Sequence, residues 1–185
     1  MHSKVLALSV AAALSAVSAS GNPPQSGSSI SPATTPQARL AAFAGHWQVR
    51  QSLWTAPGKA PQVDKGFATF SEILDGHHLR QDLHIDSAAK PFQGLGFLGY
   101  DDASGRYDSL WMDVNFSGVI LAHGSYDEAK QTYTFTGSIP LDGHAAPLRE
   151  VLRVSDANHF VYEYYEQHGG PEMLTVRLEY SRAEL

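Results

Sequence analysis

Three glycines, Gly94, Gly96 and Gly99, match the G-x-G-x-x-G pattern of dinucleotide-binding proteins letter for letter. That pattern works where a strand turns into a helix, because the N-terminus of the helix then holds the pyrophosphate. Here the glycines lie in an apolar run that leads into turn residues at positions 100–102. Glycines inside a strand instead mark a bend or a close approach of another segment. We therefore predict a strand over this motif and no nucleotide cofactor.

Several histidines could in principle hold a metal ion. His78 and His84 fall on one face of a predicted strand, but their separation of roughly 20 Å is too large for one ion. Asp82 and His84 are close enough to share a metal if another strand supplied a third ligand, such as His123 or His159. No H-E-x-x-H motif occurs, and a haem-ligating histidine would leave no spacing to test. We predict a solvated polar face here, with no metal and no cofactor.

Acidic residues are the remaining candidates for catalysis. Asp113, Glu150 and Glu163 could act as general acids or bases, although nothing in the sequence fixes their separation. Successive residues of a strand point to opposite faces, so Glu163 points away from the face that carries Tyr162 and Tyr164. We therefore expect Glu163 to be exposed. No Gly-x-Ser-x-Gly elbow occurs, and His123 and Ser125 do not form a catalytic pair. The sequence supports no particular reaction.

The elements that must position these residues are mostly strands. Residues 36–44 predict one short helix, with Thr35 as its N-cap, Pro36 in its first turn and Gly45 just beyond its end. From there, alternating apolar and polar residues recur between turn signals, of which Asp75-Gly76 is the sharpest. The predicted strands are 46–54, 66–74, 77–85, 92–99, 106–114, 118–125, 132–139, 148–154, 159–166 and 173–181. Ten sequential strands favour a single closed, antiparallel up-and-down β-barrel over a sandwich.

Strand parity indicates which side chains face the interior. Glu150 shares the parity of two leucines, and Tyr162 and Tyr164 share that of Phe160. In the third to sixth strands the inward parity stays open. The candidate ligand-binding residues are Gln81, Trp111, Asp113, Glu150, Tyr162 and Tyr164. An apolar interior with a few polar groups is typical of a small-molecule pocket, and the alternative is a filled core with Glu150 hydrogen-bonded across the barrel.

Residues 1–35 differ in composition from the rest of the chain. Residues 1–19 combine a positive start, an apolar run of about 13 residues and small residues at 17 and 19, which predicts a signal peptide. That run is too short to span a bilayer. Residues 20–35 are rich in Ser, Pro and Gly and predict a disordered linker, followed by the domain at 36–185. We expect a periplasmic or secreted protein with no transmembrane segment after cleavage.

Charge and cysteine usage exclude several classes of partner and site. The chain has 13 Lys and Arg against 19 Asp and Glu, a formal net charge of −6, and no basic run. A nucleic-acid partner or electrostatic docking to anionic lipid is therefore not expected. The absence of cysteine excludes disulfides, thiolate metal sites and cysteine nucleophiles.

The order and spacing of several motifs carry a resemblance to a known family. The motifs are Gly45-His46-Trp47, Gly66-Phe67-Ala68, Ile73–Gln81, Pro91–Asp101, Trp111-Met112-Asp113, Gly124–Asp127 and Arg149-Glu150-Val151. Together they resemble the bacterial domain of unknown function 1579 family, grouped with the lipocalin-like or calycin-type barrels. The likeness covers residues 40–181. It departs at Asp75-Gly76-His77-His78, where the family pattern has Gly-Gly-Arg and an aromatic residue.

The resemblance implies a fold and a ligand cavity, but no activity. It also implies that Trp47 closes one end of the barrel under an arginine of the last strand, with Arg182 as the first candidate and Arg177 as the second. Our first hypothesis is an exported barrel that binds a small, mainly apolar or amphipathic molecule. The second is a solid-cored structural or protein-interaction module of the cell envelope. The third is a weak enzyme that uses Asp113 or Glu150 as a base.

Overall fold

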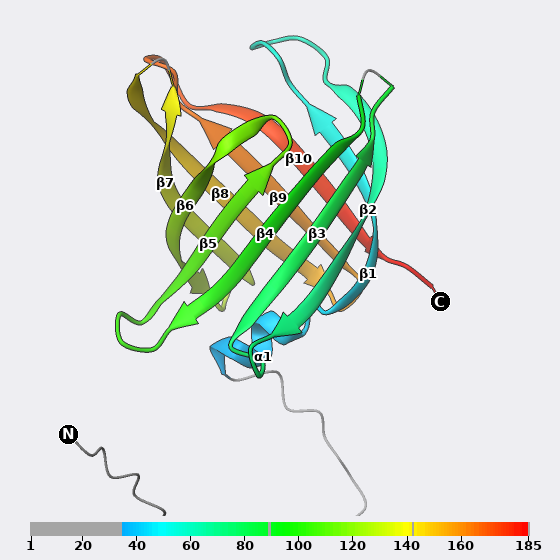
Figure 1. The fold of residues 1–185 in the computed structure, drawn as a ribbon, viewed down its shortest axis with the longest axis vertical. Helices are drawn as coiled ribbons and strands as arrows, with labels where there is room; N and C mark the ends of the chain where they lie inside the picture. The colour runs from blue at the N-terminus through cyan, green and yellow to red at the C-terminus, as the bar shows by residue number, and fades with distance from the viewer. Residues whose placement is uncertain (1–34, 89, 142, 185) are drawn as a thin grey trace, which may run out of the picture. The chain divides into compact units, whose positions relative to one another are not determined.

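A computed structural model describes residues 35–88, 90–141 and 143–184 of the chain. The predicted signal peptide at 1–19 and nearly all of the predicted linker at 20–35 lie outside these residues. Within the described part, the chain forms one helix and ten strands (Figure 1). The elements are α1 (Pro36–Ala41), β1 (Gly45–Leu53), β2 (Gln62–Ile73), β3 (His78–Asp86), β4 (Phe92–Asp101), β5 (Arg106–Asp113), β6 (Phe116–Asp127), β7 (Thr132–Leu141), β8 (His144–Asp156), β9 (His159–Glu166) and β10 (Met173–Arg182).

The strands form a closed antiparallel barrel, which confirms the predicted fold class. Each strand pairs with its neighbours in sequence, and β1 pairs with β10 to close the sheet. The closing register runs from Trp47 opposite Arg182 to Leu53 opposite Val176. Closure leaves no unpaired edge along the meander, which is the usual reason for a sheet of this size to curl on itself.

The turn between β2 and β3 shows how local sequence sets the register. Asp75 and Gly76 both have positive φ, at 57° and 80°, and the His77 N–H donates to the Leu74 carbonyl at 3.2 Å. Positive φ at both central residues is characteristic of the type I′ hairpin turn. The strands themselves pair only from Ile73 and His78 outward, so the connection is longer than the two residues that the sequence indicated.

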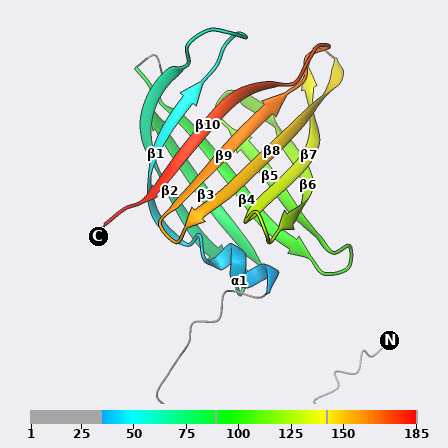
Figure 2. The ribbon, with the colours of Figure 1, turned by 180° about the vertical axis from the view of Figure 1, so that it is seen from behind.

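Helix α1 lies across one end of the barrel, at the bottom in Figures 1 and 2. The Thr35 hydroxyl accepts a hydrogen bond from the Ala38 N–H at 3.2 Å, as an N-cap does, and Pro36 stands in the first turn. The helix ends three residues before the predicted Ala44. Leu40 and Phe43 are buried in the barrel end, so this short element serves as a plug.

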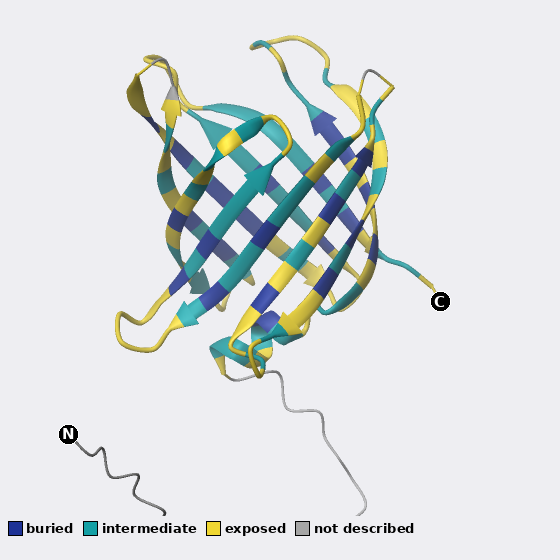
Figure 3. Cartoon of the chain, viewed as in Figure 1, coloured by how far each residue is buried: buried dark blue, intermediate teal, exposed yellow. Residues whose placement is uncertain are grey.

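Aromatic side chains fill the barrel above the plug. The Phe160 ring lies 5.0 Å from the Phe43 ring, 4.7 Å from the Trp47 ring and 4.1 Å from the Tyr180 ring, with the last pair stacked. Edge-to-face and offset aromatic pairs at these distances stabilise a core beyond the area they bury. Figure 3 shows the resulting alternation of buried and more exposed residues along the strands. This end of the barrel is a solid core.

Trp47 and Arg182 lie together at the closed end. The Arg182 guanidinium is 4.2 Å from the centre of the Trp47 ring, within cation–π range, and the indole N–H donates to the Phe43 carbonyl at 2.8 Å. The guanidinium also donates to three backbone carbonyl groups, those of Ala42, Ala44 and Ala157. These bonds connect the first strand, the last strand and the helix plug at one point.

The structure settles the parity that the sequence left open. In β5, Ser109, Trp111 and Asp113 share the inward parity, with Trp111 and Asp113 in the wall of the interior cavity, and the alternate residues face outward. In β3, Gln81 faces inward, and the outward residues form the polar face that the sequence predicted. On that face Arg80 pairs with Asp82 at 2.7 Å, and His84 contacts Asp86 at 3.0 Å.

Candidate functional site

A cavity of about 470 Å³ occupies the half of the barrel away from α1. Its floor is the aromatic core, and its walls are mainly apolar, with contributions from Leu83, Phe92, Ile120 and Leu178. The exposed residues Gln62, Lys90 and Pro140, at the strand ends opposite α1, also line it, so the cavity opens to solvent there.

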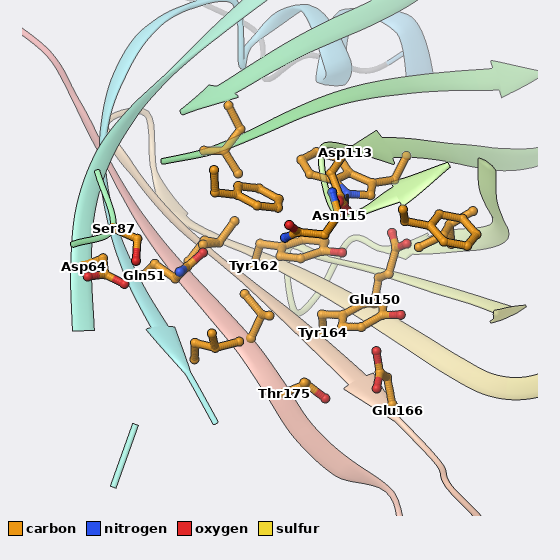
Figure 4. Close-up of a pocket in the computed structure, with 18 of the residues that line it drawn as sticks. Gln51, Asp64, Ser87, Asp113, Asn115, Glu150, Tyr162, Tyr164, Glu166 and Thr175 are labelled. Carbon is orange, nitrogen blue, oxygen red and sulfur yellow. Dashed lines mark hydrogen bonds between the residues drawn. The ribbon is translucent and has the colours of Figure 1, made fainter. Parts of the chain in front are cut away.

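The structure brings all six sequence-predicted ligand-binding residues into the wall of this one cavity. They come from four strands: Gln81 from β3, Trp111 and Asp113 from β5, Glu150 from β8, and Tyr162 and Tyr164 from β9. Figure 4 shows Tyr164 beside Glu150, and Gln51 and Asp64 on the other side of the space.

Glu150 is the most deeply buried acidic group of the site, with 3% of its surface exposed. It lies between Phe135 of β7 and Tyr164 of β9 in the sheet. The Ser109 hydroxyl, from the facing side of the interior, donates to one Glu150 carboxylate oxygen at 2.8 Å. Burial raises the pKa of this carboxyl to about 7, and the bond from Ser109 offsets only part of that effect. Near neutral pH the group therefore exists in both protonation states.

The Trp111 ring depends on the glycines of β4. A Cβ at Gly94 would lie 2.1 Å from the Trp111 ring, so this position has to be glycine for the indole to lie flat on the strand. A Cβ at Gly96 would lie 3.1 Å from the ring, which is a tight contact. The indole N–H donates to one Asp113 carboxylate oxygen at 2.9 Å, and the Asn115 N–H donates to the other at 2.8 Å. The G-x-G-x-x-G sequence is thus a strand that accommodates an aromatic ring.

Three tyrosines place hydroxyl groups in or below the cavity. Burial is the main cause that raises the pKa of Tyr162, Tyr164 and Tyr180, so all three remain neutral at physiological pH. The Gln81 side-chain amide donates to the Tyr180 hydroxyl at 2.8 Å, which fixes both groups. The negative charge of Glu150 also raises the pKa of Tyr162 and Tyr164, consistent with their closeness to that carboxyl.

Sequence reasoning missed several polar residues in or beside the cavity, among them Ser109, Glu166 and Asp64. Ser109 has the parity of Trp111 and Asp113, and Glu166 has that of Tyr164, so strand alternation could have found both. Asp64 lies in the first part of β2, which begins at Gln62 and not at the predicted Gly66. The polar residues around Asp64 do not alternate regularly with apolar ones, so the sequence did not indicate a strand there.

Glu163 corrects a prediction. It lies on the outer face of β9, as its parity indicated, but it is buried, with 7% of its surface exposed. Arg153 pairs with it at 2.6 Å and the Tyr165 hydroxyl donates to it at 2.9 Å, so long neighbouring side chains cover it. Arg177, the second candidate for closing the barrel, lies 3.7 Å from the same carboxylate and away from Trp47.

The described residues offer neither a metal site nor a membrane-spanning helix. No group of three or more His, Asp or Glu side chains there is arranged to hold a metal ion. No helix in this part of the chain has the length and apolar character needed to cross a bilayer.

The fold and site define a ten-stranded β-barrel with an interior cavity. By sequence the chain belongs to the family described as "Protein of unknown function (DUF1579)", whose profile matches residues 33–182. Curated proteins yield no match.

Several solved structures are similar to this chain, and two of them illustrate the likeness. The crystal structure of Rv2717c from M. tuberculosis matches with a TM-score of 0.62 and 19% identity, covering 81% of this chain and 99% of the other. At that identity the likeness shows the barrel fold alone. A redesigned beta barrel matches with a TM-score of 0.43 and 14% identity, covering 79% of this chain and 96% of that one.

Proposed function

We propose that this protein binds a small, mainly apolar molecule inside its barrel. The observation that carries the proposal is the cavity of about 470 Å³, open at one end and lined by apolar and aromatic side chains. Its volume falls within the roughly 300–1,000 Å³ of typical small-molecule sites. Trp111, Tyr162 and Tyr164 would supply aromatic contact, and Gln81, Asp113 and Glu150 would orient a polar end of the ligand.

The cavity weighs against a solid structural barrel. The aromatic core fills only the half next to α1, and a solid module would have no reason to leave the other half open, since voids destabilise a core.

A carboxylate-dependent enzyme is the second candidate, because the buried Glu150 has its pKa raised to about 7, as a general base at neutral pH requires. The site lacks the rest of such a constellation. Among the described residues, Ser109 is the hydrogen-bond partner of Glu150, and no second ionisable group is bonded to it. Both Asp113 oxygens already accept bonds from Trp111 and Asn115. Binding therefore stands first.

We also propose that the barrel acts outside the cytoplasm, after removal of residues 1–19. The positive start, the short apolar run and the small residues at 17 and 19 support this. A periplasmic or secreted binding protein would meet apolar molecules without needing a membrane span of its own.

Native mass spectrometry of the protein purified gently from its own host tests the binding proposal. We expect a reproducible added mass that denaturation removes. The neutral dye N-phenyl-1-naphthylamine provides a second test, because its fluorescence rises in apolar surroundings.

Trp111→Ala should weaken dye binding because it removes a wall of the cavity. Phe67→Ala is the matched control, since Phe67 is 56% exposed and has outward parity on β2. If the protein carries no added mass and fails to bind the dye, the proposal is wrong. Equal dye binding by the two variants would place the ligand elsewhere.

A further inference from the structure

The charged residues around the cavity are almost all of one sign. Four carboxylates line it, those of Asp64, Asp113, Glu150 and Glu166, and among the described lining residues Lys90 is the basic one. Lys90 is exposed on the loop between β3 and β4, at the rim. A ligand with a carboxylate or phosphate group would meet this negative field with no arginine to receive it.

Three of the four carboxylates are partly exposed and have partners near the open end. Asp113 accepts from Trp111 and Asn115, Asp64 accepts from the Gln62 amide at 2.7 Å, and Glu166 contacts the His168 ring at 2.6 Å. These groups are bound to neighbours and lie toward the open end.

Glu150 differs from them because it is buried, whereas the other three carboxylates are partly exposed. Ser109 supplies one hydrogen bond, and no Lys, Arg or His of the described residues forms an ion pair with the Glu150 carboxylate. Phe135 from β7 and Tyr164 from β9 flank Glu150 in the sheet. The other ionisable groups of this part of the wall are Tyr162, Asp113 and Glu166. An ionised carboxylate buried without a cation costs free energy that a bound cation would recover.

Aromatic rings surround the same space. Trp111, Phe92, Tyr162 and Tyr164 line the cavity with Glu150, and the Phe92 and Trp111 rings stack with their centres 6.4 Å apart. Aromatic faces attract ammonium groups through their quadrupole, and the attraction grows when the pair is removed from water. A carboxylate among aromatic rings is therefore suited to a cation attached to an apolar body.

From this arrangement we infer that the ligand of the barrel is an amphipathic amine, whose ammonium group pairs with Glu150 while its apolar body fills the cavity. The inference rests on the proposed function, since it names the class of molecule that the same cavity holds. It excludes fatty acids and other apolar anions as the preferred ligands.

Three ligands of equal chain length test the inference: 1-decylamine, 1-decanol and decanoate. Isothermal titration calorimetry at pH 8 should show that the amine binds about tenfold more tightly than the alcohol, because a charge-assisted hydrogen bond is stronger than a neutral one. Decanoate should bind most weakly. This series needs only the wild-type protein, so it does not depend on the folding of any variant.

Glu150→Gln tests the assignment of the residue. Glutamine keeps the shape and can still accept the Ser109 bond, but it cannot pair with an ammonium group. The variant should lose the preference for decylamine and keep its affinity for decanol. Glu179→Gln is the matched control because it removes the same charge from the outer surface of β10, where Glu179 pairs with Arg50 at 2.7 Å. It should bind like the wild type.

The effect of pH gives an independent readout. Below the raised pKa of Glu150, about 7, the carboxyl is protonated and no longer attracts an ammonium group. Decylamine should therefore bind about tenfold more weakly at pH 5.5 than at pH 8, with decanol nearly unchanged. The carboxyl groups of Asp113 and Glu166 and the hydroxyl groups of Tyr162 and Tyr164 cannot carry a positive charge, so they add no cation to the wall.

The outcomes separate the two proposals. If decanol binds as tightly as decylamine, or if decanoate binds best, the amine inference is wrong while the cavity remains a binding site. If Glu150→Gln keeps the full preference for the amine, the assignment to Glu150 is wrong. If none of the three ligands binds while N-phenyl-1-naphthylamine does, the amine inference alone fails. If the dye also fails to bind and the protein carries no added mass, both proposals fail.

Discussion

Glu150 couples the protonation of one side chain to the stability of the whole barrel. Burial raises its pKa in the folded protein from 4.5 to about 7. Between these two values the folded state binds a proton that the unfolded state has released, so the free energy of unfolding falls as pH rises. The stabilisation by the protonated carboxyl is complete below about pH 4.5 and is lost as the pH passes about 7. The loss amounts to about 3 kcal/mol.

Glu150→Gln should remove this dependence on pH. The amide has no proton to lose, so the variant should gain stability relative to wild type by about 3 kcal/mol between pH 4.5 and pH 8. Urea unfolding of both proteins at several pH values measures this difference, and the other titrating groups cancel in the comparison. Parallel stability curves for the two proteins would contradict the burial argument.

The alternation of side chains along a strand predicted which individual residues point into the barrel wherever the apolar pattern was regular. Alternation placed Glu150, Tyr162 and Tyr164 inward, because their strands alternate regularly with large apolar residues. Trp111 was ambiguous, since Leu110 and Met112 on the outer face are as apolar as the inner residues. The bond from Ser109 to Glu150 joins residues 41 positions apart on strands that are not neighbours, and no local pattern encodes it.

At the scale of the strand, β4 is shaped to receive an aromatic ring. We expect Gly94→Ala to displace Trp111, because the added Cβ would lie 2.1 Å from the ring. Overpacking of this kind costs roughly 1–3 kcal/mol. The displacement should also break the hydrogen bond from the indole to Asp113 and weaken dye binding.

Gly170→Ala is the control for this variant, because a Cβ there meets no atom within 4 Å and the residue has no positive φ. Thermal unfolding and near-ultraviolet circular dichroism should change for Gly94→Ala and stay close to wild type for Gly170→Ala. A Gly94→Ala protein with unchanged stability and unchanged aromatic signal would show that the ring does not rest on this strand.

The elements themselves were predictable where turn chemistry and alternation agreed. The ten strands and the barrel followed from both signals. The first residues of β2 and β8 did not, because Gln62–Lys65 and His144–Pro147 carry polar, small or proline side chains around the mouth of the barrel. At these positions backbone hydrogen bonds to the neighbouring strands hold the segment in place. Few of its side chains are buried, so the sequence shows no clear apolar alternation there.

At the scale of the whole molecule, closure decides what the interior can hold. β1 and β10 come from opposite ends of the domain's sequence and pair with each other to close the sheet. Arg182 of β10 also bonds to the residues that follow α1, and together these contacts make one end of the barrel solid. Alternation tells which side chains point inward, but the volume they leave depends on how many strands close and with what stagger. The cavity therefore could not be predicted from any single strand.

Export is the property of the whole chain that remains to be measured. Expressed in full in a bacterium, the protein should appear in the periplasmic fraction with an intact mass that begins at Ser20, because residues 17 and 19 are small as signal peptidase requires. Ala19→Arg should leave the chain uncut, while Ala19→Gly, which keeps a small residue, should be processed normally. Helix α1 begins at Pro36 and the barrel at Gly45, so neither change should alter thermal unfolding of the domain. A cytoplasmic protein of full mass would refute the export proposal and leave the binding proposal standing, because the described residues that line the cavity begin at Gln51.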